Sequence, residues 1–129
     1  MVRIDDLLGV RFTSHGRNAS EGFDCYGLAI EVSKRFGHEL VDLWYKKGGE
    51  RTFTELAGKV LSEMGEKLEV TNLPFESCLI VFYDGQGNMV HIGVMLDEEK
   101  FIHADTGGVM VVSLEDYHRK NWRAYKWRQ

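Results

Sequence analysis

The stretch at residues 22–28 reads GFDCYGL, and it marks the point where a loop gives way to a helix. The residues before it, 13–22, are rich in glycine, serine, threonine and asparagine, which favour turns. Asp24 is a good N-cap residue, and apolar side chains then recur at helical spacing until Gly37, which favours a helix end. The sequence therefore predicts a helix that begins at Asp24 and ends near Gly37, with Cys25 in its first turn.

A thiol at this position lies near the positive end of the helix dipole and near backbone N–H groups that lack helical partners. Both favour the thiolate, so the sequence predicts a lowered pKa for Cys25. The same N–H groups are suited to hold the oxyanion of an acyl-transfer reaction. Cys25 is thus a candidate nucleophile. The alternative is a small buried core residue, which is the commoner role of a cysteine in an amphipathic helix.

The rest of the chain divides into predicted helices followed by predicted strands. A short helix is expected at Ile4–Leu8, a second from the capping-box pattern at Thr52–Glu55 to Gly65, and a third at Ser113–Asp116. From Leu68 the apolar period changes to two. Five strands are expected at 68–71, 79–83, 89–96, 101–104 and 109–112, as an antiparallel meander, and a final strand is expected at 122–128.

The expected architecture is α+β, with N-terminal helices packed on a C-terminal antiparallel β-sheet. The length of 129 residues, with 43% hydrophobic and 28% charged residues, fits a single domain at 1–129.

Two of the five histidines are predicted to meet on one face of the sheet. Strand alternation puts His91 and Gly93 on the same face, and a three-residue turn at 97–99 would place His103 opposite Gly93. His91 and His103 then become diagonal neighbours, with Gly93 leaving the gap between them unfilled. This arrangement predicts a hydrogen bond between the two rings, whereas a one-residue shift in register would separate them.

Two other interpretations of these residues stay open. Each histidine can be a polar residue on the exposed face of a half-buried sheet. Cys25, His91 and His103 can also form a zinc site with an open fourth position. The sequence has no closely spaced ligand pair such as Cys-x-x-Cys to anchor a metal, so no metal and no cofactor are expected.

The charge pattern disfavours several classes of partner. The net charge is −4 and charges of both signs are interspersed, which argues against nucleic acid and against a polybasic membrane surface. The basic, aromatic stretch 119–128 has a composition typical of binding to single-stranded nucleic acid, but its apolar side favours a terminal β-strand.

The longest near-apolar run, 78–83, is too short to span a membrane. Acidic residues at positions 5 and 6 interrupt any signal peptide, so synthesis in the cytoplasm is expected.

Three motifs in order resemble the NlpC/P60 cysteine peptidases. They are GFDCYGL at 22–28, HIGV at 91–94 and FIHA at 101–104, and the resemblance extends from about Leu7 to Trp122. Members of this family carry an Asp-Cys-Ser-Gly-Leu type helix start, a His-Val-Gly-Ile type strand and a third polar residue on the next strand. The loop residues Gly16 and Arg17, and Tyr26 in place of the usual serine, are most similar to the phage-tail-associated subgroup of cell-wall peptidases.

The resemblance implies a papain-like core that hydrolyses an amide bond of a peptidoglycan stem peptide or a related small peptide. The D-Glu to diamino acid bond is the type expected, and the reaction would pass through a thioester. By resemblance, Cys25 is the nucleophile, His91 the general base and His103 the residue that orients His91. Asp24, Arg17 and Tyr26 are the candidate substrate-binding residues.

One departure from the family pattern concerns the oxyanion. Many members have a tyrosine in the loop before the cysteine, and the nearest match here is Phe12, which has no hydroxyl. An alternative function is therefore a weak or inactive phage tail assembly or binding module with the same fold, with phage tail proteins as partners and the virion tail as its location. The presence of Cys25, His91 and His103 favours the enzyme.

Overall fold

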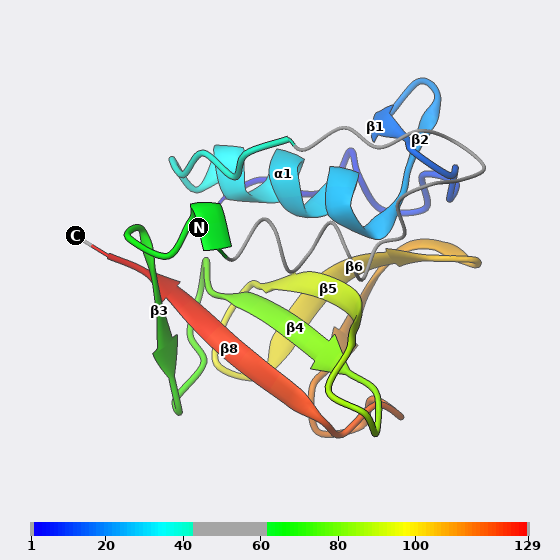
Figure 1. Cartoon of the computed structure of the whole chain (residues 1–129). Helices are drawn as coiled ribbons and strands as arrows, with labels where there is room; N and C mark the ends of the chain where they lie inside the picture. Colours follow the sequence, from blue (N-terminus) through cyan, green and yellow to red (C-terminus); the bar gives the residue numbers. More distant parts are fainter. Residues whose placement is uncertain (1, 43–61, 129) are drawn as a thin grey trace.

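The helix predicted at the GFDCYGL stretch is present as α1, Cys25–Arg35, and packs against one face of a sheet (Figure 1). This computed structural model describes residues 2–42 and 62–128. The strands are β1 Arg17–Asn18, β2 Gly22–Phe23, β3 Leu68–Thr71, β4 Leu79–Tyr83, β5 Met89–Met95, β6 Lys100–Asp105, β7 Gly108–Ser113 and β8 Trp122–Trp127.

Both ends of α1 follow from local chemistry. At the start, the Asp24 carboxylate accepts a hydrogen bond of 2.6 Å from the Gly27 N–H, as an N-cap does. At the end, Gly37 has a φ of +90°, its N–H donates to the Lys34 carbonyl, and the His38 N–H donates to the Ser33 carbonyl. These are the two hydrogen bonds of a Schellman motif. The predicted start and stop of the helix are confirmed.

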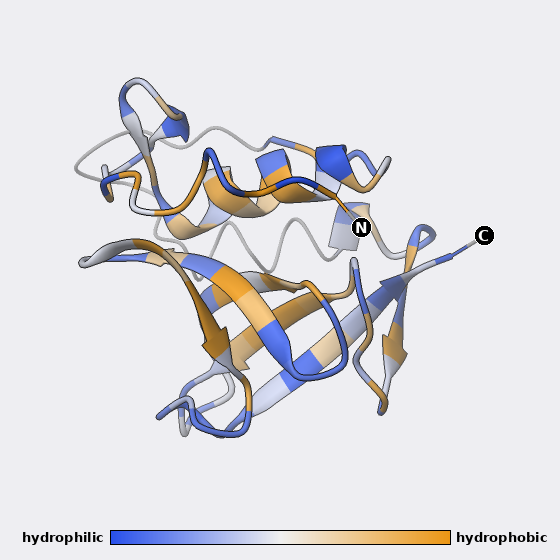
Figure 2. Ribbon diagram, turned by 180° about the vertical axis from the view of Figure 1, so that it is seen from behind, coloured by the Kyte–Doolittle hydropathy of each residue, from blue (hydrophilic) through white to orange (hydrophobic). Residues whose placement is uncertain are grey.

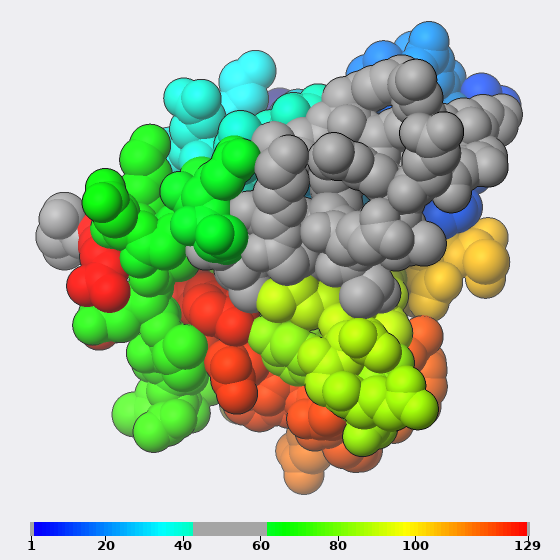
Figure 3. Space-filling view, viewed as in Figure 1, coloured from blue at the N-terminus to red at the C-terminus, as the bar shows by residue number. Residues whose placement is uncertain are grey.

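The large sheet contains six strands in the order β3-β8-β4-β5-β6-β7, and every neighbouring pair is antiparallel. The six predicted strands are all present. The predicted meander is correct for β4 to β7 but wrong for β3, because β8 lies between β3 and β4 (Figure 3). Alternation fixes which side chains share a face, and it carries no information about which strands are neighbours.

The two faces of the sheet carry separate apolar clusters. On the α1 side, Val81, Ile92, Val94 and Ile102 pack with the buried face of the helix. On the other side, Ile80, Phe82, Met95, Phe101 and Tyr117 form a second cluster. Figure 2 shows the apolar residues of α1 turned toward the sheet.

The structure corrects two of the predicted helices. Residues 5–9 form turns, closed by hydrogen bonds such as Leu7 N–H to the Ile4 carbonyl, because so short a segment does not sustain a helix. Ser113 ends β7, and 114–116 form a turn in which the Leu114 N–H donates to Glu99. The predicted helix from Thr52 lies mostly outside the described residues. In 2–42 and 62–128 the complete helix is α1, in place of several N-terminal helices.

The short hairpin β1–β2 was not expected from the sequence. Arg17 pairs with Phe23 and Asn18 with Gly22, within the loop that leads to Cys25. This hairpin fixes the direction from which the chain enters α1.

Within the described ranges, no helix combines the length and apolar character required to cross a membrane.

Candidate active site

Cys25 is the first residue of α1, and its thiol lies at the junction of the helix with β5. The side chain is partly exposed and packs at the edge of the apolar cluster that contains Ile92. The backbone N–H groups of Ile92 and Tyr26 lie close enough to the sulfur to favour its thiolate. The thiol also interacts electrostatically with Asp105 and Tyr117, and both of these side chains lie beside His91.

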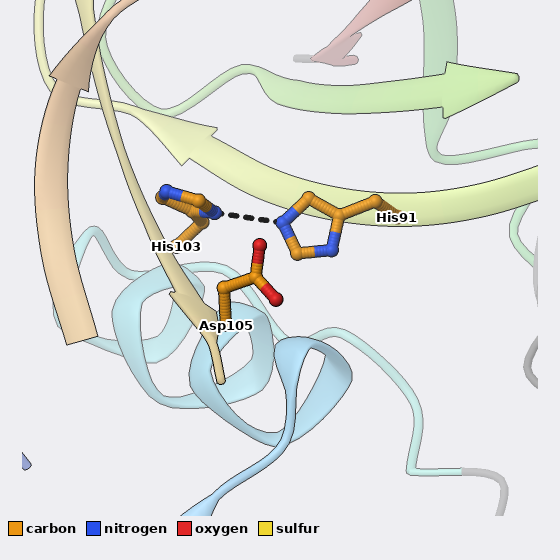
Figure 4. Close-up of side chains that lie close together, drawn as sticks. All are labelled: His91, His103 and Asp105. Atoms are coloured by element: carbon orange, nitrogen blue, oxygen red, sulfur yellow. Dashed lines mark hydrogen bonds between the residues drawn. The ribbon is translucent and has the colours of Figure 1, made fainter. Parts of the chain in front are cut away.

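His91 and His103 form the predicted pair. The distance from His91 Nε2 to His103 Nδ1 is 2.7 Å, and the rings meet edge to face at an angle of 84° (Figure 4). The register that produces this contact is the expected one, with Met95 opposite Phe101. The exposed fractions are 6% for His91 and 2% for His103, so the bond is shielded from water.

Glycine is needed at position 93 for a reason that differs from the expected one. The space above it is filled by the Phe101 ring, because an added Cβ would lie 2.7 Å from Phe101 Cδ2 and 2.9 Å from the Ile102 carbonyl oxygen. Glycine is therefore required for close packing of β5 on β6, and the gap expected between the two imidazoles is absent.

Aromatic side chains surround the pair, and most of them were not predicted from the sequence. Tyr117 is 7% exposed and its ring centroid lies 5.3 Å from that of His103. The ring centroids of Phe82 and His91 lie 5.9 Å apart, and those of Phe101 and His103 lie 5.1 Å apart. Tyr117 comes from the irregular segment after β7, which has no periodic signal, so its place here could not be predicted.

Burial sets the charge state of the site. Desolvation lowers the pKa of His91 to about 4, and the nearby His103 acts in the same direction. Desolvation also lowers the pKa of His103. Burial raises the pKa of Cys25 to about 12, with a smaller contribution from the Asp24 carboxylate. The expected thiolate is thus wrong for the resting protein, because desolvation outweighs the helix N-terminus.

The hydrogen bond determines which nitrogen of His91 can act as a base. When Nε2 of His91 donates its proton to Nδ1 of His103, Nδ1 of His91 keeps a free lone pair. That nitrogen can accept the thiol proton of Cys25. A cysteine with a histidine base, itself oriented by a third polar group, is the arrangement of nucleophilic acyl transfer.

A third polar side chain, Asp105, was not predicted. One of its carboxylate oxygens and one ring nitrogen each of His91 and His103 all lie within 4.8 Å of one another (Figure 4). Three such donors can attract a metal ion, but nitrogens bound to one zinc ion lie about 3.3 Å apart. The 2.7 Å contact is instead the length of a hydrogen bond, so a proton lies between the two rings.

The three candidate substrate-binding residues meet beside the helix start. Arg17 Nη1 lies 2.8 Å from an Asp24 carboxylate oxygen and donates to the Gly16 carbonyl. Its guanidinium lies 5.7 Å from the centre of the Tyr26 ring, and the Tyr26 hydroxyl donates to the Val41 carbonyl. These contacts tie the hairpin to α1. A role for Asp24, Arg17 and Tyr26 in substrate binding stays a prediction.

Phe12 pairs with Phe23 through a single parallel β-bridge, which places it on the segment beside the β1–β2 hairpin. Its side chain is 37% exposed. An oxyanion donor at this position is lacking because phenylalanine has no hydroxyl, so backbone N–H groups at the start of α1 are the donors available here.

Comparison with known proteins identifies the fold. The NlpC/P60 family matches residues 9–128 of the chain. Among solved structures, the chain is similar to the crystal structure of the NlpC/p60 domain of the peptidoglycan hydrolase SagA, with 19% sequence identity and a TM-score of 0.55. The match covers 89% of this chain and 86% of that chain. No curated protein matches the sequence. Because the family match spans nearly the whole chain and the fold agrees, this chain belongs to the NlpC/P60 family.

Proposed function

We propose that the chain is a cysteine peptidase or amidase that hydrolyses an amide bond of a peptidoglycan stem peptide. The observation that carries the proposal is the buried hydrogen bond between His91 and His103, whose neighbours Asp105 and Tyr117 interact electrostatically with Cys25 at the start of α1. Membership in a family of cysteine peptidases and amidases supports the class of reaction. The finer part of the proposal is that the bond joins D-Glu to a diamino acid.

The reaction has two halves. In the first, the Cys25 proton passes to Nδ1 of His91, the sulfur attacks the carbonyl carbon, and the amide C–N bond breaks as the amine takes the proton from His91. In the second, water attacks the thioester carbon and gives a proton to His91, and the C–S bond breaks as sulfur regains that proton. The sum is hydrolysis of one amide to an acid and an amine.

The test uses a synthetic stem tripeptide, L-Ala-γ-D-Glu-diaminopimelate, with its products measured by mass spectrometry. Cys25→Ala is expected to reduce hydrolysis to background while the protein stays folded. Cys78→Ala is the matched control, because Cys78 is a fully buried thiol in the second apolar cluster, whereas Cys25 packs against the first. Hydrolysis by Cys25→Ala at the wild-type rate would contradict the proposal.

Phe12 favours a second candidate, a phage tail assembly or binding module without effective catalysis. The missing hydroxyl weakens the oxyanion site. This candidate predicts that the wild-type protein binds the tripeptide or a phage tail protein but neither cleaves the peptide nor forms an acyl group on Cys25.

A further inference from the structure

Asp105 places a carboxylate beside the two imidazoles, and the proposed reaction gives it no role. It is the last residue of β6, two positions after His103, so strand alternation turns both side chains to the same face. Figure 4 shows the carboxylate directed toward the contact between the His91 and His103 rings. Its oxygen lies within 4.8 Å of a nitrogen of each ring, which is close enough for the carboxylate charge to interact with His91.

The carboxylate is held in place by the end of the β6–β7 hairpin. Asp105 pairs with Gly108, and the Thr106 N–H donates to Asp105 Oδ1 at 2.8 Å. The residue is half-buried, so its charge is less screened by solvent than that of a surface carboxylate.

The charges around His91 come from several elements. His103 lies on β6, His118 and Arg119 lie after β7, and each of these three disfavours a positive His91. Asp105 acts in the opposite direction and favours it. Tyr117 packs against the ring, and burial raises the pKa of its hydroxyl, so it is uncharged near neutral pH. Cys25 lies at the start of α1, and its thiol interacts electrostatically with Asp105.

The two halves of the reaction differ in how much they need this carboxylate. During acylation a positive His91 forms together with a Cys25 thiolate, and Asp105 favours the first charge but disfavours the second. Its two effects oppose each other. During hydrolysis of the thioester, sulfur is bonded to carbon and carries no charge, and the negative charge that balances a positive His91 lies on the oxyanion of the tetrahedral intermediate, beside the backbone N–H groups at the start of α1. The unfavourable effect of Asp105 on a Cys25 thiolate is then absent, and its favourable effect on His91 remains.

We propose that Asp105 is a positioning residue that stabilises positive charge on His91 while water hydrolyses the thioester. The inference rests on the proposed function, because it requires the acyl-enzyme on Cys25. Asp105 is expected to control the second half of the reaction more strongly than the first.

The kinetic test uses p-nitrophenyl acetate, which needs no knowledge of the natural substrate. The burst of nitrophenolate reports acetylation of Cys25, the steady rate reports hydrolysis of the thioester, and mass spectrometry reports acetyl-Cys25. In Asp105→Asn the steady rate is expected to fall about three- to tenfold, and its acid limb to move by up to about one pH unit to lower pH. The burst rate changes less than twofold, and acetyl-Cys25 accumulates.

Two variants accompany this comparison. Asp105→Glu keeps the charge and is expected to restore much of the steady rate and the acid limb. Asp116→Asn makes the same chemical change at an exposed turn after β7 and is expected to behave like the wild type.

A second readout needs no catalysis. The protonated fraction of His91 at pH 4.5, measured by NMR of labelled histidine, is expected to be lower in Asp105→Asn than in the wild type. An unchanged fraction overturns the inference, and so does an equal loss of burst and steady rate. If the wild type forms no acetyl-Cys25, the proposed function is contradicted, and so is the role of Asp105 in hydrolysis of the thioester. The NMR comparison then still reports whether Asp105 stabilises positive charge on His91.

Discussion

Burial keeps the Cys25 thiol and the His91 ring neutral at pH 7 in the resting protein, because either charge alone is poorly solvated there. Proton transfer between them creates two opposite charges together, and their attraction offsets part of this cost. In the proposed reaction the Cys25 thiolate is therefore generated in step with its attack on the substrate.

The reactivity of Cys25 toward iodoacetamide tests this charge state. A pKa raised to about 12 leaves less thiolate at pH 7 than an ordinary thiol has, so alkylation of the folded protein is expected to be slow and still rising above pH 9. Peptide mass spectrometry measures the rate. In denaturant, Cys25 and Cys78 should both react as ordinary thiols with a pKa near about 8.5. Fast alkylation with a midpoint below pH 7 would contradict a neutral resting thiol.

The orienting role proposed for His103 predicts an order among the effects of its substitutions. An asparagine or glutamine oxygen can still accept the proton of His91 Nε2, whereas alanine cannot and also leaves space against Tyr117. His103→Ala is expected to lose about 10- to 100-fold in kcat/KM on the stem tripeptide, and His103→Gln and His103→Asn less. Melting temperatures check that the variants fold. Equal losses in all three would count against orientation.

The residues of the site were predictable where their positions depend on nearby sequence alone. His91 and His103 follow from the two-residue period of the strands and the length of one turn, and their hydrogen bond confirms that register. The pKa of Cys25 was not predictable, because it depends on side chains that only the fold brings together. Asp105 lies two residues from His103 and could have been found by extending the same alternation.

At the scale of the elements, the cap residues Asp24 and Gly37 predicted both ends of α1, and the two-residue period predicted the six strands of the large sheet. Asp24 and Gly37 act on their own neighbours, so their effect is visible in the sequence. The same reasoning failed at Ile4–Leu8 and Ser113–Asp116, where a single turn closes before a helix can propagate.

Gly93→Ala tests the close packing of β5 on β6. The added Cβ would meet the Phe101 ring and the Ile102 carbonyl, and the carbonyl is backbone that cannot turn aside. The free energy of unfolding in urea is expected to fall by about 1–3 kcal/mol. Gly85→Ala is the control, because nothing lies within 4 Å of a Cβ at that turn. An equal effect of the two substitutions would show that Gly93 has no special packing role.

At the scale of the whole molecule, the buried histidines make stability depend on pH. In the unfolded chain a histidine binds a proton below about pH 6.5, whereas folded His91 does so only near pH 4. The unfolded state therefore binds more protons in this window. Stability from His91 is present above pH 6.5 and is lost as the pH falls toward 4, by up to about 1.4 kcal/mol per pH unit.

Urea unfolding at pH 7, 5.5 and 4.5 measures this dependence. The wild type is expected to lose stability across the series, with His103 adding in the same direction. His91→Gln, which cannot titrate, is expected to show a shallower loss. Parallel curves for the two proteins would place the acid sensitivity elsewhere, for example at His103 or His38, whose pKa values burial also lowers.

The position of β8 between β3 and β4 has a consequence for synthesis on the ribosome. Leu68–Thr71 is made early, but its strand partner Trp122–Trp127 follows about fifty residues later. At the usual rates of translation this delay is roughly 3–10 s. During that time the backbone groups of β3 have no neighbouring strand, so the nascent chain carries an open edge to which a chaperone or a second nascent chain can bind.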